Sequence, residues 1–212
     1  MRSQSLRGWM DVLQQEGILK TVNREVSLEY ELAALGKKAD GKYTLLFNNV
    51  GQKNIPVITG SAGSRASFAK AVGVSVEELV TAFAQAQANP RDCVLVEPSA
   101  APVKEEITFD VDLTKLPIPV HHEKDGGPYL TAAVLIAKDP KTGARNLSIH
   151  RLQVLGPKKL GILILPRHLH HFFRAAENEG KPLEIALAIG LDPILLLASQ
   201  AIAPLGFDEY TI

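Results

Sequence analysis

The chain has 212 residues, of which 46% are hydrophobic and 22% are charged. These values are typical of a folded globular protein, so they exclude a disordered or low-complexity chain. Lysine plus arginine and aspartate plus glutamate each number 23, which gives a formal net charge of zero. Because dedicated nucleic-acid binders are usually basic, we expect no nucleic-acid partner.

The single cysteine, Cys93, excludes an internal disulfide. Because the N-terminus also lacks the apolar core of a signal peptide, we expect a reducing, cytoplasmic location. The most apolar stretch, 183–205, is interrupted by Glu184 and Asp192 and falls short of the length of a membrane-spanning helix. We therefore expect no membrane partner and predict that this stretch is buried core.

The first half of the chain alternates helical and strand patterns, which is typical of a small α/β unit. Apolar residues at helical spacing predict a helix from Leu6 to about Gly17, and Ser27 is suited to cap a second helix. Ser75 and Glu78 have the spacing of a capping box that opens a further helix. The remaining elements expected here are a helix over 66–72 and strands over 18–22, 43–47, 55–59 and 93–96.

A Pro- and Ala-rich segment, 97–106, is typical of a linker, so we predict an N-terminal unit over 1–105 and a second domain over 106–212. The second domain is mainly strands, and tight turns between them predict an antiparallel meander. Asp192 followed by Pro193 is a typical helix start. The other elements expected are strands over 131–137, 144–155, 160–165 and 183–189 and a helix over 168–177. The predicted fold class is therefore α+β.

The segment from Asn146 to Arg151 carries the clearest chemical pattern. On a strand, Asn146, Ser148 and His150 share one face, whereas Arg151 faces the other. Burying such a polar row costs free energy unless a ligand binds it, and the alternative is a half-exposed edge strand. An amide oxygen, an imidazole nitrogen and a carboxylate oxygen together form a ligand set that suits a hard or borderline divalent cation. An arginine can bind a carboxylate or a phosphate through two hydrogen bonds.

Other polar patterns are less specific. The run His168-Leu169-His170-His171 fits either a metal site or the polar start of a helix. The Gly126-Gly127 pair lacks the strand-loop-helix context of a dinucleotide site and fits a plain loop. Ser148 has no glycine elbow around it, which argues against a hydrolase nucleophile. All six histidines lie between His121 and His171, so the second half is where we expect the chemistry.

These motifs resemble the N-terminal part of the UbiD-like decarboxylases, which use prenylated flavin mononucleotide (prFMN). The most specific matches are Asn146-x-Ser-Ile-x-Arg151, Pro166-Arg167-His168 and Asp208-Glu209, in that order. The opening from Leu6 to Val22 and the segments 45–49 and 112–117 are similar to further landmarks of the family. The resemblance covers essentially the whole chain.

The resemblance implies an incomplete split β-barrel of the flavin-binding type for residues 106–212. It implies that Asn146, His168 and Glu209 bind a divalent metal, usually manganese, which bridges to the cofactor phosphate. A potassium ion near Ser199 and Glu209 is also implied. Arg151 takes the catalytic role of positioning the reacting carboxylate. The residues implied to bind the cofactor are Asn146, Ser148, Ile149, His150, Arg151, Leu163, Ile164, Leu165, Arg167, His168 and Glu209.

The function implied is a reversible decarboxylase, a carboxy-lyase of aromatic, heteroaromatic or α,β-unsaturated carboxylic acids. A flavin prenyltransferase supplies the cofactor in that family, and full-length members form homo-oligomers. The family's catalytic glutamates belong to a segment beyond residue 212, so the chain resembles a fragment or one part of a split enzyme. Two alternatives stay open: a non-catalytic flavin-binding or assembly subunit completed by another chain, and a flavin reductase module that uses unmodified flavin.

Overall fold

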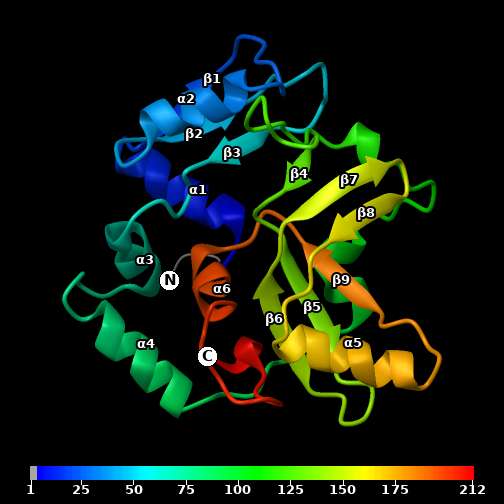
Figure 1. Ribbon diagram of the computed structural model, residues 1–212. Helices are drawn as coiled ribbons and strands as arrows, with labels where there is room; N and C mark the ends of the chain where they lie inside the picture. Colours follow the sequence, from blue (N-terminus) through cyan, green and yellow to red (C-terminus); the bar gives the residue numbers. More distant parts are fainter. Residues whose placement is uncertain (1–3) are drawn as a thin grey trace.

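A computed structural model describes residues 4–212 (Figure 1). Its strands form three separate three-stranded sheets with helices packed on them, which confirms the α+β class. The helices are α1 (Leu6–Gln15), α2 (Glu31–Ala39), α3 (Arg65–Val72), α4 (Leu79–Ala88), α5 (His168–Asn178) and α6 (Pro193–Ala198), with 3-10 helices η1 (Pro98–Ala100), η2 (Pro102–Lys104), η3 (Leu113–Lys115) and η4 (Glu209–Thr211). The strands are β1 (Leu19–Val22), β2 (Thr44–Phe47), β3 (Val57–Thr59), β4 (Tyr129–Leu130), β5 (Val134–Lys138), β6 (Arg145–Ile149), β7 (Leu152–Gly156), β8 (Lys159–Ile162) and β9 (Ile185–Ala188).

The N-terminal sheet is the predicted α/β unit. Strand β1 pairs with β2 in parallel through the crossover helix α2, and β3 then pairs with β2 antiparallel. Side chains alternate along β2, so Leu45 and Phe47 pack with α2, whereas Leu46 packs with α1. Trp9 of α1 is fully buried in that second layer. The same layer includes Ile194 of α6, so it joins the N-terminal sheet to the second half of the chain.

Local cap signals in the sequence are largely confirmed. Asp192 caps α6 as predicted, because its Oδ1 atom accepts a hydrogen bond from the Ile194 amide at 2.9 Å and Pro193 is the first helical residue. Ser75 and Glu78 form the reciprocal capping box, with hydrogen bonds of 3.2 and 3.0 Å. The second helix is an exception, because it begins at Glu31 and not at Ser27. Tyr30 has a φ of 65°, a left-handed conformation that separates Ser27 from the first helical residue.

The predicted antiparallel meander is wrong. The expected strand 144–155 is interrupted at His150 and Arg151, which separate β6 from β7. Strand β6 pairs with β5, which also pairs with β9, whereas β7 pairs with β4 and β8. The outer edge of β6 contacts η4 instead of another strand, so β7 has no free edge there to join. The described strands form no closed barrel, and the split-barrel arrangement and the domain boundary near 105 stay predictions.

Two apolar segments are more exposed than the sequence predicts. The expected strand 93–96 is irregular chain, with Val94 and Leu95 exposed by 88% and 87%. The stretch 183–205 is only partly buried, because Ile202 is 92% exposed. Hydrophobicity alone does not bury a segment that has no neighbouring surface to cover it. None of the helices in the described chain is long and apolar enough to span a membrane.

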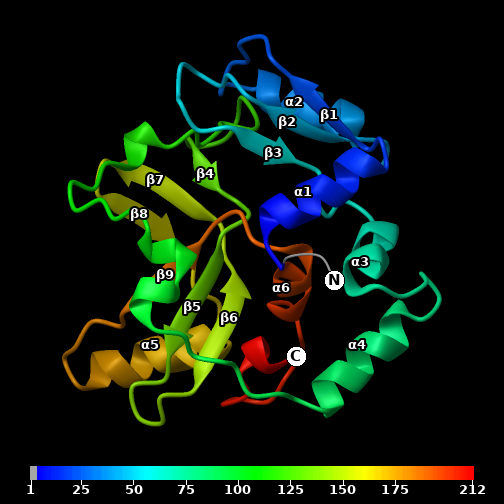
Figure 2. The ribbon, with the colours of Figure 1, turned by 180° about the vertical axis from the view of Figure 1, so that it is seen from behind.

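Helix α5 is placed by its apolar face. Leu169 and Phe172 are buried against Leu135 and Ala137 of β5, the central strand of its sheet. Because α5 begins at His168, this packing fixes the position of that histidine relative to β6, which lies beside β5 (Figure 1; Figure 2 from behind).

We predict that Phe172→Ala lowers the free energy of unfolding by about 3–5 kcal/mol, because it leaves a cavity between α5 and β5. The matched control is Phe109→Ala, since Phe109 is 90% exposed whereas Phe172 is 1% exposed. The control should change stability by no more than about 0.5 kcal/mol. Urea unfolding followed by circular dichroism measures both, and equal effects of the two substitutions would contradict this packing.

Candidate functional site

A cavity of about 680 Å³ opens beside β6. Its walls come from β6, the loop after β8, the start of α5, the segment 199–203 and the first residue of η4. The residues predicted from sequence that line it are Asn146, Ser148, Ile149, His150, Arg151, Leu163, Leu165, Arg167, His168, Ser199 and Glu209. Ile164 does not line the cavity, because its side chain packs against the α5–β5 core.

Two of the predicted metal ligands are in direct contact. The Nδ1 atom of His168 lies 3.0 Å from Oδ1 of Asn146. Asn146 is buried, with 4% of its surface exposed, although β6 is an edge strand. Both alternatives left open by the sequence therefore hold in part: the strand is at an edge, and its polar row faces a cavity.

Glu209 is the third predicted ligand, and it is 2% exposed. Its Oε2 atom accepts a hydrogen bond from the backbone amide of Leu147 at 2.8 Å. Burial raises the pKa of the Glu209 carboxyl above its usual value of 4.5, and the hydrogen bond from Leu147 only partly offsets this. Within residues 4–212, no lysine or arginine pairs with this carboxylate.

The chemistry of this donor set fits a divalent cation. Two ligand atoms at right angles on a metal, each about 2.1 Å from it, lie about 3.0 Å apart. The separation between the Asn146 oxygen and the His168 nitrogen is 3.0 Å. A buried carboxylate without a cationic partner is stabilised in its charged form by a bound cation. The described residues contain no group of three His, Cys, Asp or Glu side chains that could hold a metal ion, and one of the three donors in this set is an amide.

A chain of hydrogen bonds fixes the orientation of the Asn146 amide. Its Nδ2 atom, which can only donate, lies 3.3 Å from the hydroxyl of Ser148. The hydroxyl lies 3.0 Å from Nε2 of His150 and can donate its own hydrogen there. Burial lowers the pKa of the His150 imidazole, and a hydrogen bond with the Leu163 backbone opposes this. The order of donors leaves the Asn146 oxygen directed at His168.

Arg151 lies on the cavity wall beyond the end of β6. The sequence predicted that it would face away from His150, yet both residues line the cavity because the strand ends at Ile149. Strand alternation does not extend beyond the strand itself. No carboxylate pairs with Arg151 within the described chain, so its guanidinium is available to a ligand. Arg167 is exposed on the same cavity.

The histidine run at the start of α5 divides between two roles. Only His168 lines the cavity. His171 is exposed and packs edge-on against Phe172, with ring centroids 6.3 Å apart.

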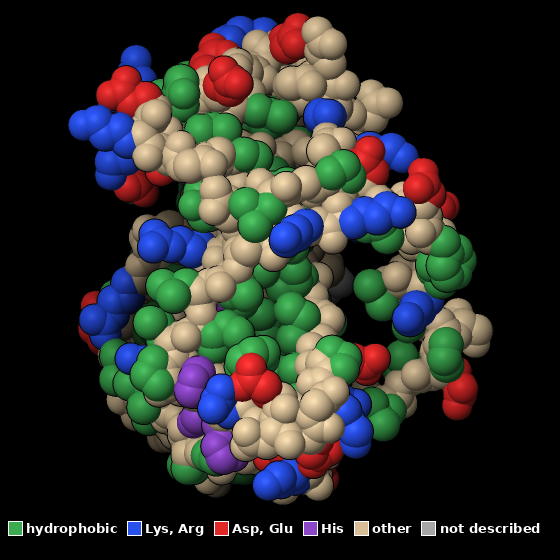
Figure 3. All heavy atoms as spheres, turned by 45° about the vertical axis from the view of Figure 1, so that its right-hand side comes forward, with side chains coloured by type: hydrophobic (Ala, Val, Ile, Leu, Met, Phe, Trp, Pro, Cys, Tyr) green, Lys and Arg blue, Asp and Glu red, His purple; other side chains and the backbone are tan. Residues whose placement is uncertain are grey.

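The Gly126-Gly127 loop does not line this cavity, and the carbonyl of Gly126 accepts a hydrogen bond from Gln153 at 2.7 Å. Histidine side chains gather on one face of the molecule, beside a hollow lined by hydrophobic side chains (Figure 3).

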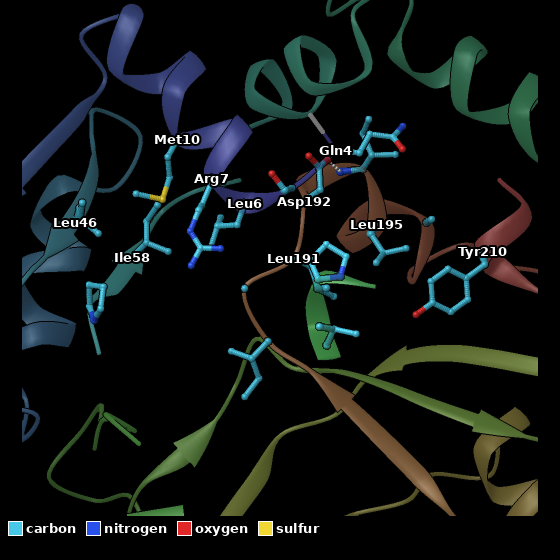
Figure 4. Close-up of a pocket in the computed structure, with 18 of the residues that line it drawn as sticks. Gln4, Leu6, Arg7, Met10, Leu46, Ile58, Leu191, Asp192, Leu195 and Tyr210 are labelled. Atoms are coloured by element: carbon cyan, nitrogen blue, oxygen red, sulfur yellow. Dashed lines mark hydrogen bonds between the residues drawn. The ribbon is translucent and has the colours of Figure 1, made fainter. Parts of the chain in front are cut away.

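A second cavity of about 830 Å³ lies between the N-terminal unit and α6. Its lining is mainly apolar, with Arg7 of α1 projecting into it and Tyr210 at its far side (Figure 4). Glu209 lines both cavities and therefore lies between them.

The residues that hold Glu209 in place were not predicted from the sequence. Arg145 contacts Asp208 and Tyr210, the two neighbours of Glu209, from the first position of β6. The amide of Leu147 was missed as well, because backbone donors leave no signature in side-chain patterns. A signal existed only for Arg145, which immediately precedes the Asn146 motif and is a long cation in an otherwise half-buried strand.

We predict that Glu209→Ala accelerates hydrogen exchange at the Leu147 amide and costs about 1–3 kcal/mol of stability, since it leaves a buried donor without its partner. Hydrogen-exchange NMR and urea unfolding provide the two measurements. Glu177→Ala is the control, because Glu177 is exposed on α5 and pairs with Arg174. Unchanged protection of the Leu147 amide would contradict the contact between β6 and η4.

Comparison with known proteins identifies the family. Residues 94–212 match the profile of the 3-octaprenyl-4-hydroxybenzoate carboxy-lyase Rift-related domain, and residues 10–87 match its N-terminal domain. Over 98% of the chain, the sequence is 36% identical to an anhydromevalonate phosphate decarboxylase of Methanothermobacter thermautotrophicus, of which it covers 47%. It is 34% identical to a phenolic acid decarboxylase of Bacillus subtilis, with coverage of 99% and 47%. The chain thus spans about half the length of the curated relatives it matches.

Solved structures agree with this assignment. An evolved dimeric form of the UbiD-class enzyme HmfF from Pelotomaculum thermopropionicum, in complex with prFMN, is 57% identical to this chain with a TM-score of 0.96. The match covers 99% of this chain and 49% of that one. The fold, both family profiles and the relatives lead to one conclusion: the chain belongs to the UbiD family.

Proposed function

We propose that this chain forms the cofactor site of a reversible prFMN-dependent decarboxylase that acts on aromatic, heteroaromatic or α,β-unsaturated carboxylic acids. The observation that carries the proposal is the contact of Asn146 with His168, and the placement of Glu209 on the same cavity. Relatives named as decarboxylases support the reaction class, and the prFMN complex of the Pelotomaculum enzyme supports the cofactor.

In this proposal the metal is Mn²⁺ or another divalent cation held by Asn146, His168 and Glu209. These groups provide an amide oxygen, an imidazole nitrogen and a carboxylate, which suit such a cation. The cavity of about 680 Å³ is within the range of small-molecule sites. Leu163 and Leu165, both exposed, offer apolar surface to a flavin ring, and Arg167 offers a cation to its phosphate.

Arg151 would bind the substrate carboxylate. Its guanidinium is on the cavity wall without a protein carboxylate as partner, and its planar fork can hold both carboxylate oxygens. This contact would orient the acid and balance its charge until carbon dioxide leaves. When bound, prFMN would supply the electron sink for that step. His150, next to Arg151, would shape the substrate pocket.

Further parts of the proposal follow the family and concern the whole protein. A flavin prenyltransferase would supply the cofactor, and the complete protein would be a cytoplasmic homo-oligomer. A potassium ion would bind near Ser199, which is 5% exposed and lines the cavity together with Glu209. The Ser199 hydroxyl donates a hydrogen bond to the Leu196 carbonyl at 2.8 Å and accepts one from the Gln200 side chain at 3.2 Å, which leaves one oxygen lone pair that can coordinate a cation.

We predict that Mn²⁺ strengthens binding of FMN to the 212-residue chain, and that EDTA reverses the effect. FMN serves as the probe because it carries the phosphate that the metal would contact. His168→Ala should weaken Mn²⁺ binding by more than about 100-fold, since loss of an outer contact alone costs about 10–100-fold. Isothermal titration calorimetry measures the metal and flavin fluorescence measures FMN.

The matched control for this experiment is His171→Ala. His171 lies on the same helix but is exposed and outside the cavity, so its replacement should leave both affinities unchanged. Flavin binding that is indifferent to Mn²⁺, or equal effects of the two histidine substitutions, would reject the metal assignment.

We predict that Arg151→Lys impairs decarboxylation nearly as much as Arg151→Ala, by about 100-fold or more, because lysine keeps the charge but loses the two-oxygen geometry. The assay uses a chimera in which this chain replaces the matching half of the Pelotomaculum enzyme, reconstituted with prFMN and tested on that enzyme's own substrate. Arg174→Lys, an exposed position on α5, is the control.

Near-normal turnover by Arg151→Lys with flavin still bound would contradict the proposed role. Loss of flavin from both Arg151 variants would instead assign the arginine to the cofactor. A chimera that binds prFMN but never turns over would favour the alternative of a non-catalytic flavin-binding subunit. Tight binding of unmodified FMN with reductase activity would favour the reductase alternative.

A further inference from the structure

Arg145 contacts both chain neighbours of Glu209. Its Nε atom donates a hydrogen bond to Oδ2 of Asp208 at 2.7 Å, and its Nη2 atom forms an ion pair with the same oxygen at 2.6 Å. Its guanidinium carbon also lies 4.9 Å from the centre of the Tyr210 ring, a cation–π distance. One side chain from the first residue of β6 therefore holds the residues on either side of the proposed ligand.

Asp208 transmits this contact to the backbone of η4. Its second carboxylate oxygen, Oδ1, accepts a hydrogen bond from the Tyr210 amide at 3.0 Å and caps the short helix. The Asp208 backbone carbonyl accepts another from the Thr211 hydroxyl at 2.6 Å. A single turn of 3-10 helix has few hydrogen bonds of its own, so its position depends on such contacts.

A sulfur atom and a backbone contact complete the surroundings of Arg145. Its Nη2 atom lies 3.3 Å from the sulfur of Cys93, which in turn lies 3.5 Å from the Tyr210 carbonyl. The Arg91 amide donates to the Thr211 carbonyl at 2.8 Å. The segment 91–93 therefore contacts η4 as well as Arg145.

We infer that Arg145 is a positioning residue, which through Asp208 and Tyr210 holds the Glu209 carboxylate at the place where it can bind the metal. The inference rests on the proposed metal site. Partners of this kind, one contact away from a metal, typically contribute 10–100-fold to metal affinity because they orient the ligand itself.

The competing explanation is that Arg145 merely stabilises the fold. The two explanations differ in what they change. The Arg145–Asp208 pair is partly exposed, at 26% and 22%, and such pairs contribute little to overall stability. Loss of a merely structural pair would leave metal affinity unchanged, whatever its small effect on the unfolding midpoint. Loss of a positioning pair would lower metal affinity at a nearly constant midpoint.

The test measures Mn²⁺ binding to the 212-residue chain by electron paramagnetic resonance, which counts free Mn²⁺ and records the spectrum of bound Mn²⁺. Arg145→Gln and Asp208→Asn should each weaken binding by about 10–100-fold. Asp208→Asn has the same shape as the native side chain and keeps an oxygen for the Tyr210 amide, so it tests the inference even if Arg145→Gln fails to fold. The double variant should be no weaker than either single one, because both remove the same interaction.

Three controls separate the possible results. Arg24→Gln removes an exposed arginine that pairs with Glu31, and it should bind Mn²⁺ like the unsubstituted chain. The unfolding midpoint of metal-free Asp208→Asn should stay within about 3 °C of the unsubstituted chain. Glu209→Gln, which replaces the carboxylate ligand with a neutral amide, should bind more weakly than either Arg145→Gln or Asp208→Asn.

One result would overturn the inference and leave the metal site intact. In it, Arg145→Gln and Asp208→Asn bind Mn²⁺ with an affinity within twofold of the unsubstituted chain, while Glu209→Gln binds weakly. If the unsubstituted chain does not bind Mn²⁺, or if Glu209→Gln binds Mn²⁺ as tightly as the unsubstituted chain, the proposed metal site is rejected and this inference with it.

Discussion

The site depends on the free edge of strand β6. In the sheet order β6-β5-β9, β6 is paired on one side only, and an edge strand must find other partners for its outward amides. Here the partner of the Leu147 amide is the carboxylate of Glu209, 62 residues further along the chain. This one hydrogen bond excludes a further strand from that edge and brings a buried carboxylate to the cavity wall.

Three consecutive residues of β6 make three different contacts from that edge. Arg145 binds Asp208 through its side chain, Asn146 meets His168 through its side chain, and Leu147 binds Glu209 through its backbone. A rigid strand is well suited to making these three contacts, because it holds its side chains and backbone amides at fixed spacing. The proposed metal ligands thus come from a strand, a helix start and a late 3-10 turn, and their convergence is a property of the fold.

Sequence predicted the parts of this structure that local chemistry determines. The capping box of Ser75 and Glu78 was correct because both partners are three residues apart. The division of residues 144–155 into two strands in two sheets was missed, because no Gly, Pro, Asn or Asp stands at or beside the break at His150 and Arg151 to signal a turn. Family motifs pointed to Asn146, His168 and Glu209. They gave no indication of Arg145, whose role arises only when Asp208 folds back onto β6.

The most direct measurement is an anomalous-scattering map at the manganese edge, from crystals grown with Mn²⁺ and FMN. The account predicts one strong peak about 2.0–2.3 Å from the Asn146 oxygen, a His168 nitrogen and a Glu209 oxygen, with the flavin phosphate beside it. A flavin bound in the cavity with no manganese peak between these three side chains would contradict the account.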